Sequence, residues 1–130
     1  MTRRLLTGLI AALLAAPVGA VGLGPLSKTG VIDGPSQAFY LTLLNPYETA
    51  TEFRLYPVGQ EDEESQARVD VFPYAPVLAS RATRQILVIA NGLAVGETYQ
   101  FRVCAERATP PQGIAINARV CSKLSARRIA

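Results

Sequence analysis

Histidine and tryptophan are both absent from the 130 residues, and methionine occurs once. Without histidine the chain cannot build a Ser-His or Cys-His nucleophilic pair, and it cannot bind zinc through imidazole nitrogen. No glycine-rich phosphate loop of the G-x-x-x-x-G-K or G-x-G-x-x-G type occurs either. Two carboxylates can form an acid/base pair, but most acidic residues lie in one short run, 61–64, or at polar strand positions. We therefore expect a protein that is not an enzyme and that uses no cofactor and no metal.

A strong charge of either sign is also missing. The chain has 13 basic and 10 acidic residues, and two of the basic ones are Arg3 and Arg4. These two precede an apolar run, 5–16, and a small-residue site, 18–20, which together are typical of a secretory signal peptide. Removal of residues 1–20 leaves 11 basic and 10 acidic residues. Nucleic-acid binding is therefore not expected, because it requires a clear basic excess.

The apolar run at the amino terminus is also too short to be a membrane span, which needs about 20 apolar residues. We expect no stable membrane span after the signal peptide is removed. The mature protein is predicted to be periplasmic, secreted or at the cell surface.

Short runs of alternating apolar residues, separated by Gly, Pro, Asn and acidic residues, make up most of residues 21–130. This pattern predicts one all-β domain, a seven-stranded immunoglobulin-like antiparallel β-sandwich. The expected strands are 27–33, 37–45, 51–58, 67–72, 84–90, 98–106 and 113–124.

Four segments between and beyond these strands are expected to be irregular. Residues 22–26 are expected to form a flexible lead, and the basic end 123–130 is expected to fray. The acidic run 59–66 lacks the Asp and Gly spacing of a calcium loop and is expected to be solvated. In 71–88, Pro73 and Pro76 lack backbone donors and are expected to end one strand at a corner of the fold.

The chain has only two cysteines, Cys104 and Cys121, and both alternate with apolar residues on expected strands. In an exported chain this predicts a disulfide. The competing interpretation, two free thiols in a redox site, lacks a C-x-x-C spacing. Neighbouring antiparallel strands bring facing residues within disulfide range. We therefore expect Cys104 to face Cys121 on the outer surface of a hairpin, with Glu106 opposite Arg119.

Several short motifs occur in a familiar order. They are VIDG (31–34), Asn-Pro (45–46), V-x-P-x-x-x-x-L (71–78), GETYQFRV (96–103) and IAI (114–116). In this order they resemble the amino-terminal immunoglobulin-like domain of the periplasmic pilus-assembly chaperones, the PapD-like family. The resemblance covers about residues 21–128.

The resemblance implies a function for the last expected strand. In that family, alternating apolar residues of this strand supply a missing strand to an incomplete pilus subunit. The matching residues here are Ile114 and Ile116, and Ala118 shares their face. The alternative is that these side chains pack into the core of their own domain.

The resemblance also implies a site for a carboxylate. Family members hold the terminal carboxylate of the subunit with two basic residues, but the matching positions here carry Thr29 and Cys121. The candidates for contact with a carboxylate or an acidic partner are the nearby cations Lys28, Arg119 and Lys123.

We therefore expect a non-enzymatic envelope protein that acts by β-strand pairing in the assembly or chaperoning of a pilus-like surface structure. Its partner is expected to be a pilus-type subunit or another envelope protein. One alternative is a structural subunit or accessory component of a surface fibre or lattice. Another is a module that binds a small ligand or a polysaccharide, for which the sequence offers no exposed aromatic platform.

Overall fold

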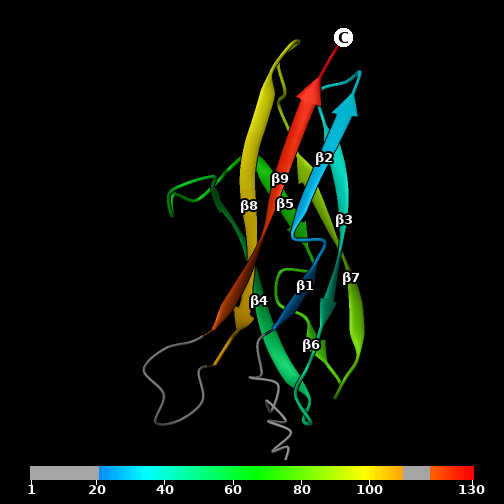
Figure 1. Ribbon diagram of the computed structural model, residues 1–130, viewed down its shortest axis with the longest axis vertical. Helices are drawn as coiled ribbons and strands as arrows, with labels where there is room; N and C mark the ends of the chain where they lie inside the picture. The colour runs from blue at the N-terminus through cyan, green and yellow to red at the C-terminus, as the bar shows by residue number, and fades with distance from the viewer. Residues whose placement is uncertain (1–20, 110–117) are drawn as a thin grey trace, which may run out of the picture.

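The computed structural model describes residues 21–109 and 118–130. Within these residues the protein is all-β, and its strands form two sheets, of order β1-β3-β7-β5 and β2-β9-β8-β4-β6 (Figure 1). No helix in the described part is long and apolar enough to cross a membrane. The strands are β1 (Gly22–Gly24), β2 (Ser27–Ile32), β3 (Gln37–Leu44), β4 (Thr51–Gly59), β5 (Val69–Phe72), β6 (Val77–Leu78), β7 (Thr83–Ala90), β8 (Thr98–Arg107) and β9 (Arg119–Arg128).

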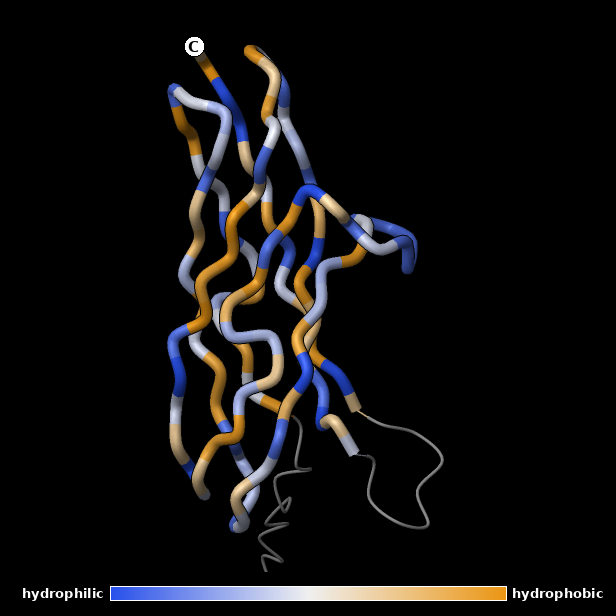
Figure 2. Tube along the Cα trace, turned by 180° about the vertical axis from the view of Figure 1, so that it is seen from behind, coloured by the Kyte–Doolittle hydropathy of each residue, from blue (hydrophilic) through white to orange (hydrophobic). Residues whose placement is uncertain are grey.

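The core lies between the two sheets and is built by the alternation seen in the sequence. Polar and apolar residues alternate along the strands (Figure 2), so each strand turns one apolar side inward. Phe39 on β3 and Phe101 on β8 are buried, and their rings meet edge to face with centroids 6.3 Å apart. The two sheets therefore contact each other directly. The same core contains Leu41, Leu43, Phe53, Leu55, Ile86, Val88, Val103, Ala105 and Leu124.

The immunoglobulin-like sandwich is confirmed, but the described residues form nine strands, where seven were predicted. One additional strand is β1, in the segment that we expected to be a flexible lead. It pairs with β3, and the flanking Val21 and the central Leu23 are buried in the core. A Cβ on Gly22 would lie 3.0 Å from the Cβ of Leu44, so glycine permits this close approach.

The second additional strand, β6, explains the proline-rich segment. β5 pairs with β7 in the four-stranded sheet, whereas β6 pairs with β4 in the five-stranded sheet. Pro73 and Pro76 lie between them, where the chain crosses from one sheet to the other. The carbonyl of Pro76 accepts a hydrogen bond from Phe53 N–H at 2.9 Å. The predicted corner is therefore a change of sheet.

The last strand differs most from the prediction. β9 spans Arg119–Arg128, whereas the predicted strand ended at residue 124 and its first residues, 113–117, lie outside the described residues. Most of the basic end is therefore strand rather than frayed chain. Residues 123–128 pair with β2 in parallel, so the sandwich is not wholly antiparallel. Leu124 and Ala126 are buried in the core, which explains why this polar segment is held in the sheet.

Aromatic side chains are also more exposed than we expected. Tyr40 on β3 and Phe72 on β5 are each 53% exposed, and Tyr74 is 68% exposed. Tyr40 and Phe72 are both in register with Leu87 on β7, so they lie in one row across the four-stranded sheet. We expected no exposed aromatic platform, and this row of exposed aromatic side chains differs from that expectation.

Candidate partner-binding edge

β9 has an open edge at its amino-terminal end. β8 pairs with β9 from Arg119 to Arg127, whereas β2 pairs with it only from Lys123 to Arg128. Among the described residues, β8 is thus the only strand in register with Arg119–Ser122. Figure 1 shows this part of β9 extending beyond the start of β2. An unpaired edge of this kind is available to another strand.

The spacing of Cα atoms shows which backbone groups face the open side. The Cα atoms of Cys104 and Cys121 are 4.0 Å apart, the short spacing typical of a non-hydrogen-bonded antiparallel pair. The backbone N–H and C=O groups of Arg119 and Cys121 therefore point away from β8. Lys123 follows the same alternation, and its N–H donates to the carbonyl of Leu26 at 2.8 Å. Arg119 and Cys121 present the same groups where β2 has not yet begun.

The predicted disulfide joins Cys104 to Cys121 across β8 and β9, in the register that the sequence indicated. Val103 and Ala105, which flank Cys104, belong to the core, so the bond lies on the opposite, outer face. Cys104 is nevertheless fully buried. Tyr56 on β4 is its neighbour in the same row of the sheet. The bond is thus on the predicted face, where Cys104 is covered and Cys121 is partly exposed.

Glu63, in the loop between β4 and β5, binds the first residue of β9. Its carboxylate accepts two hydrogen bonds from the Arg119 guanidinium, at 2.6 and 2.7 Å, and one from Arg102 at 3.2 Å. The bonds from Arg119 are the main reason that the pKa of Glu63 falls from 4.5 to about 2. Glu106 is in register with Arg119 as predicted, yet the ion pair of Arg119 forms with Glu63. We call Glu63, Arg102 and Arg119 the Glu63 clamp.

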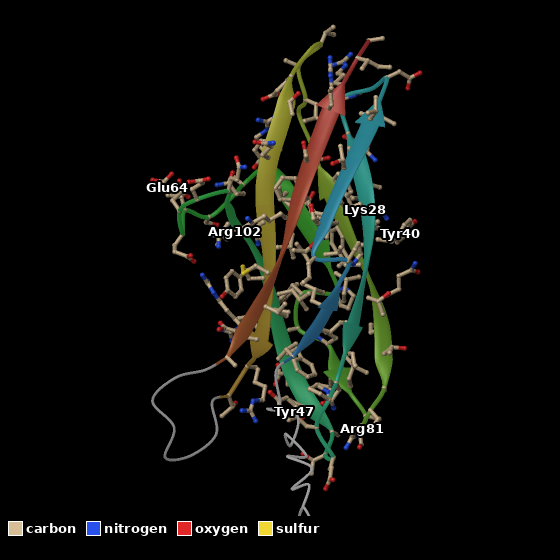
Figure 3. All side chains as sticks on the ribbon, viewed as in Figure 1. Lys28, Tyr40, Tyr47, Glu64, Arg81 and Arg102 are labelled. Carbon is tan, nitrogen blue, oxygen red and sulfur yellow. A yellow bond between two sulfur atoms is a disulfide. The ribbon has the colours of Figure 1, made fainter. Side chains whose placement is uncertain are left out.

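The acidic loop is folded against β8, although we expected it to be only solvated. Arg102 donates to the carbonyl oxygens of Gly59 and Asp62, at 2.9 and 2.7 Å. Within the loop, Gly59 N–H donates to the carbonyl of Glu64 at 3.0 Å. A Cβ on Gly59 would lie 2.0 Å from the Asp62 carboxylate, so any other residue there would displace the Asp62 side chain. Figures 1 and 3 show the loop projecting from the side of the sandwich, with Arg102 at its base.

The three candidate cations are divided between two places. Lys28 and Lys123 line one hollow of about 220 Å³ beside β2 and β9, whereas Arg119 binds Glu63. Both lysines are exposed, and neither forms a salt bridge in the described part of the chain. Hydroxyl, amide and apolar groups complete the hollow: Ser27, Thr29, Gln60, Gln100, Phe101, Leu124 and Ser125. Lys28 is in register with the core residue Leu124, and Lys123 is in register with Ser27, so the two lysine side chains leave the sheet from opposite faces, one on each side of this edge.

Two of the predicted strand-donor residues, Ile114 and Ile116, lie outside the described residues. Ala118, the third, is exposed and immediately precedes β9. Val120, on the inner side of β9, is partly buried against the core. In the described ranges, no group of three or more Cys, Asp or Glu residues is arranged to hold a metal ion.

No family model matches this sequence, and no curated protein is similar to it. Solved structures do match. The E. coli chaperone DraB superposes with a TM-score of 0.65 at 17% identity, over 84% of this chain and 55% of DraB. The SafB chaperone, solved with the Salmonella enterica SafA pilin, appears in a match with a TM-score of 0.67 at 20% identity, over 85% of this chain and 55% of the other.

A third similar structure is a PapD-like domain of human CEP192, with a TM-score of 0.64 at 18% identity over 98% of both chains. The present chain thus spans about the whole of this isolated domain but little more than half of the pilus chaperones. The protein has the PapD-like immunoglobulin fold, as the order of its motifs indicated. At these identities the likeness establishes the fold.

Proposed function

We propose that this protein receives a strand of a pilus-type subunit, or of another envelope protein, at the open edge of β9. It thereby helps to chaperone or assemble a surface structure. The observation that carries the proposal is the mismatch between β2 and β9, which leaves Arg119–Ser122 with one strand neighbour among the described residues. Structural similarity to the pilus chaperones DraB and SafB supports the same role.

Charge predicts the direction of the incoming strand. A strand that occupies the open position lies in line with β2 and ends near Lys28 and Lys123. If it runs parallel to β9, as β2 does, its carboxyl end approaches the two ammonium groups. If it runs antiparallel, its positively charged amino end approaches them instead. A parallel strand with a free terminal carboxylate is therefore favoured.

Residues that precede the open edge in the sequence are proposed to give the contact its specificity. Ile114, Ile116 and Ala118 supply the alternating apolar positions that meet the partner, while backbone bonds supply affinity. Lys28 and Lys123 bind its carboxylate. Arg119, the third candidate cation, has its guanidinium on Glu63 and is not assigned to the partner.

The place of action is proposed to be the periplasm or the cell surface. Export through the amino-terminal signal is consistent with the disulfide, since such bonds persist in oxidising compartments.

A photo-crosslinking amino acid at Ala118 tests the proposal in the native host. The matched control places the same amino acid at Gln85, an exposed residue of β7 on the other sheet. We expect an adduct with a strand-deficient surface subunit from position 118 alone, in a one-to-one complex that is absent from finished fibres. Equal adducts from both positions contradict binding at this edge. Retention of the protein in finished fibres supports the structural-subunit alternative.

A further inference from the structure

The open part of β9, residues Arg119–Ser122, is paired with a neighbouring strand on one side only. Strand ends fray when few contacts hold them, and Arg119 is the first residue of β9, preceded by the exposed Ala118. The disulfide fixes Cys121 in the middle of this part. The remaining question is what holds its first residue in the plane of the sheet.

The Glu63 clamp provides that support. Arg102 is in register with Lys123, just beyond one end of the open part, and Arg119 forms the other end. Glu63 binds both guanidinium groups, so it joins the two ends through side chains, independently of the backbone ladder. The Arg119 guanidinium also donates to the Tyr56 hydroxyl on β4 at 3.2 Å, which extends the contact across three strands.

The loop that carries Glu63 has its own anchor. The Arg102 side chain is only 17% exposed and binds the carbonyl oxygens of Gly59 and Asp62. Glu63 is therefore held at the surface of β8 whether or not Arg119 is present. A carboxylate fixed in this way can restrain Arg119, because the loop does not have to be ordered by that bond.

We propose that Glu63 is a positioning residue for partner binding. This inference rests on the proposed function. Through Arg119 it holds the open part of β9 against β8, with the backbone groups of Arg119 and Cys121 directed at the incoming strand. Two other consequences follow. Arg119 is neutralised by Glu63, and the carboxylate of the partner is left to Lys28 and Lys123.

Glu63→Gln tests the proposal, with Glu97→Gln as its matched control. Glu97 also accepts two bonds from one arginine, Arg68, at 2.7 and 3.0 Å, but it lies in the turn before β8. The first readout is amide hydrogen exchange of the free protein, measured by NMR at Val120 and Ser122, whose N–H groups point toward β8. We expect Glu63→Gln to accelerate their exchange about tenfold and Glu97→Gln to leave it unchanged.

The second readout is the affinity for a synthetic twelve-residue peptide of alternating Val and Thr with a free terminal carboxylate. We expect Glu63→Gln to weaken binding about fivefold and Glu97→Gln to leave it unchanged. Unchanged exchange at Val120 and Ser122 in Glu63→Gln overturns the positioning role, as does faster exchange with unchanged affinity. If the wild-type protein does not bind the peptide, the strand-addition proposal fails, and the exchange data still decide whether Glu63 holds β9.

Discussion

The backbone N–H of Lys123 donates to the carbonyl of Leu26 at 2.8 Å, and this bond marks where the edge of β9 becomes closed. From Lys123 onward β9 is paired on both sides, with β2 and β8. Before it, Arg119–Ser122 pair with β8 alone in the described structure, although the Ser122 hydroxyl donates a hydrogen bond to the carbonyl of Pro25 at 2.6 Å. The boundary places an open strand edge next to the two lysines of the hollow.

Changing both lysines of the hollow should reduce binding of a carboxylate. For Lys28→Gln/Lys123→Gln we expect about tenfold weaker binding of the alternating Val/Thr peptide at low salt, and a smaller difference at high salt. The same peptide with an amidated carboxyl end should bind wild type and variant equally. Arg84→Gln, which removes an exposed cation of β7, is the control. Equal loss for both peptides contradicts carboxylate recognition at these lysines. Isothermal titration calorimetry gives the affinities.

Removing the disulfide should destabilise the domain. Cys104 and Cys121 are 17 residues apart in the sequence, and a cross-link of that span stabilises by about 3 kcal/mol in the chain-entropy estimate. We expect Cys104→Ala/Cys121→Ala to lose about 2–3 kcal/mol in guanidinium unfolding, with a larger m-value because the unfolded chain without the cross-link exposes more surface. Mass spectrometry of the exported protein should show no free thiol. An unchanged unfolding midpoint, or two free thiols, contradicts a structural disulfide.

Asn45 should be among the most sensitive polar residues. It is fully buried, and its side-chain amide donates to the carbonyl oxygens of Thr49, Leu78 and Ala79 at 3.0–3.1 Å. Asn45→Ala removes these three bonds and leaves the carbonyl of Leu78 without its side-chain donor, so we expect a loss of about 2–4 kcal/mol in thermal or denaturant unfolding. Ser80→Ala, which removes one exposed hydrogen bond, should cost less than about 1 kcal/mol. Equal effects of the two substitutions contradict this assignment.

Two carboxylates should make the free energy of unfolding depend on pH in the acid range. Hydrogen bonds from Arg119 and Arg68 lower the pKa values of Glu63 and Glu97 in the folded protein from 4.5 to about 2. Both groups therefore stabilise the folded state above pH 4.5, and this contribution is lost as the pH falls from 4.5 toward 2. We expect Glu63→Gln/Glu97→Gln to flatten the stability profile over this interval. Unfolding midpoints measured from pH 2 to 7 check the result, and an unaltered slope in the double variant contradicts it.

The strands that were predicted well are those whose alternation matches burial on one side. Phe39, Leu41 and Leu43 on β3 are all buried, and the outward positions between them are exposed. The facing of Cys104 and Cys121 follows from the same period of two. In these elements local sequence and tertiary structure agree, so the pattern alone was sufficient.

The elements that the sequence did not reveal depend on distant partners. β1 contains two glycines in three residues, a composition typical of loops, and becomes a strand because Val21 and Leu23 enter the core. The end of β9 looks too polar for a strand and is held by β2, near the other end of the chain. Glu63 was assigned to a solvated loop because its partner, Arg119, is 56 residues away. The sequence did contain a signal for this ion pair. Each strand of the β8–β9 hairpin carries an arginine, Arg102 or Arg119, and the chain has one acidic run, 61–64, that could pair with them.

The most direct test of strand addition at β9 is amide hydrogen exchange at Arg119 and Cys121, in the free protein and in complex with the crosslinked subunit. Both N–H groups point to the open edge, so a paired strand must bond them. We predict that exchange at these two residues slows about 100-fold in the complex, while buried β3 amides such as Leu41 are unchanged. A stable complex in which Arg119 and Cys121 exchange as fast as in the free protein contradicts the account.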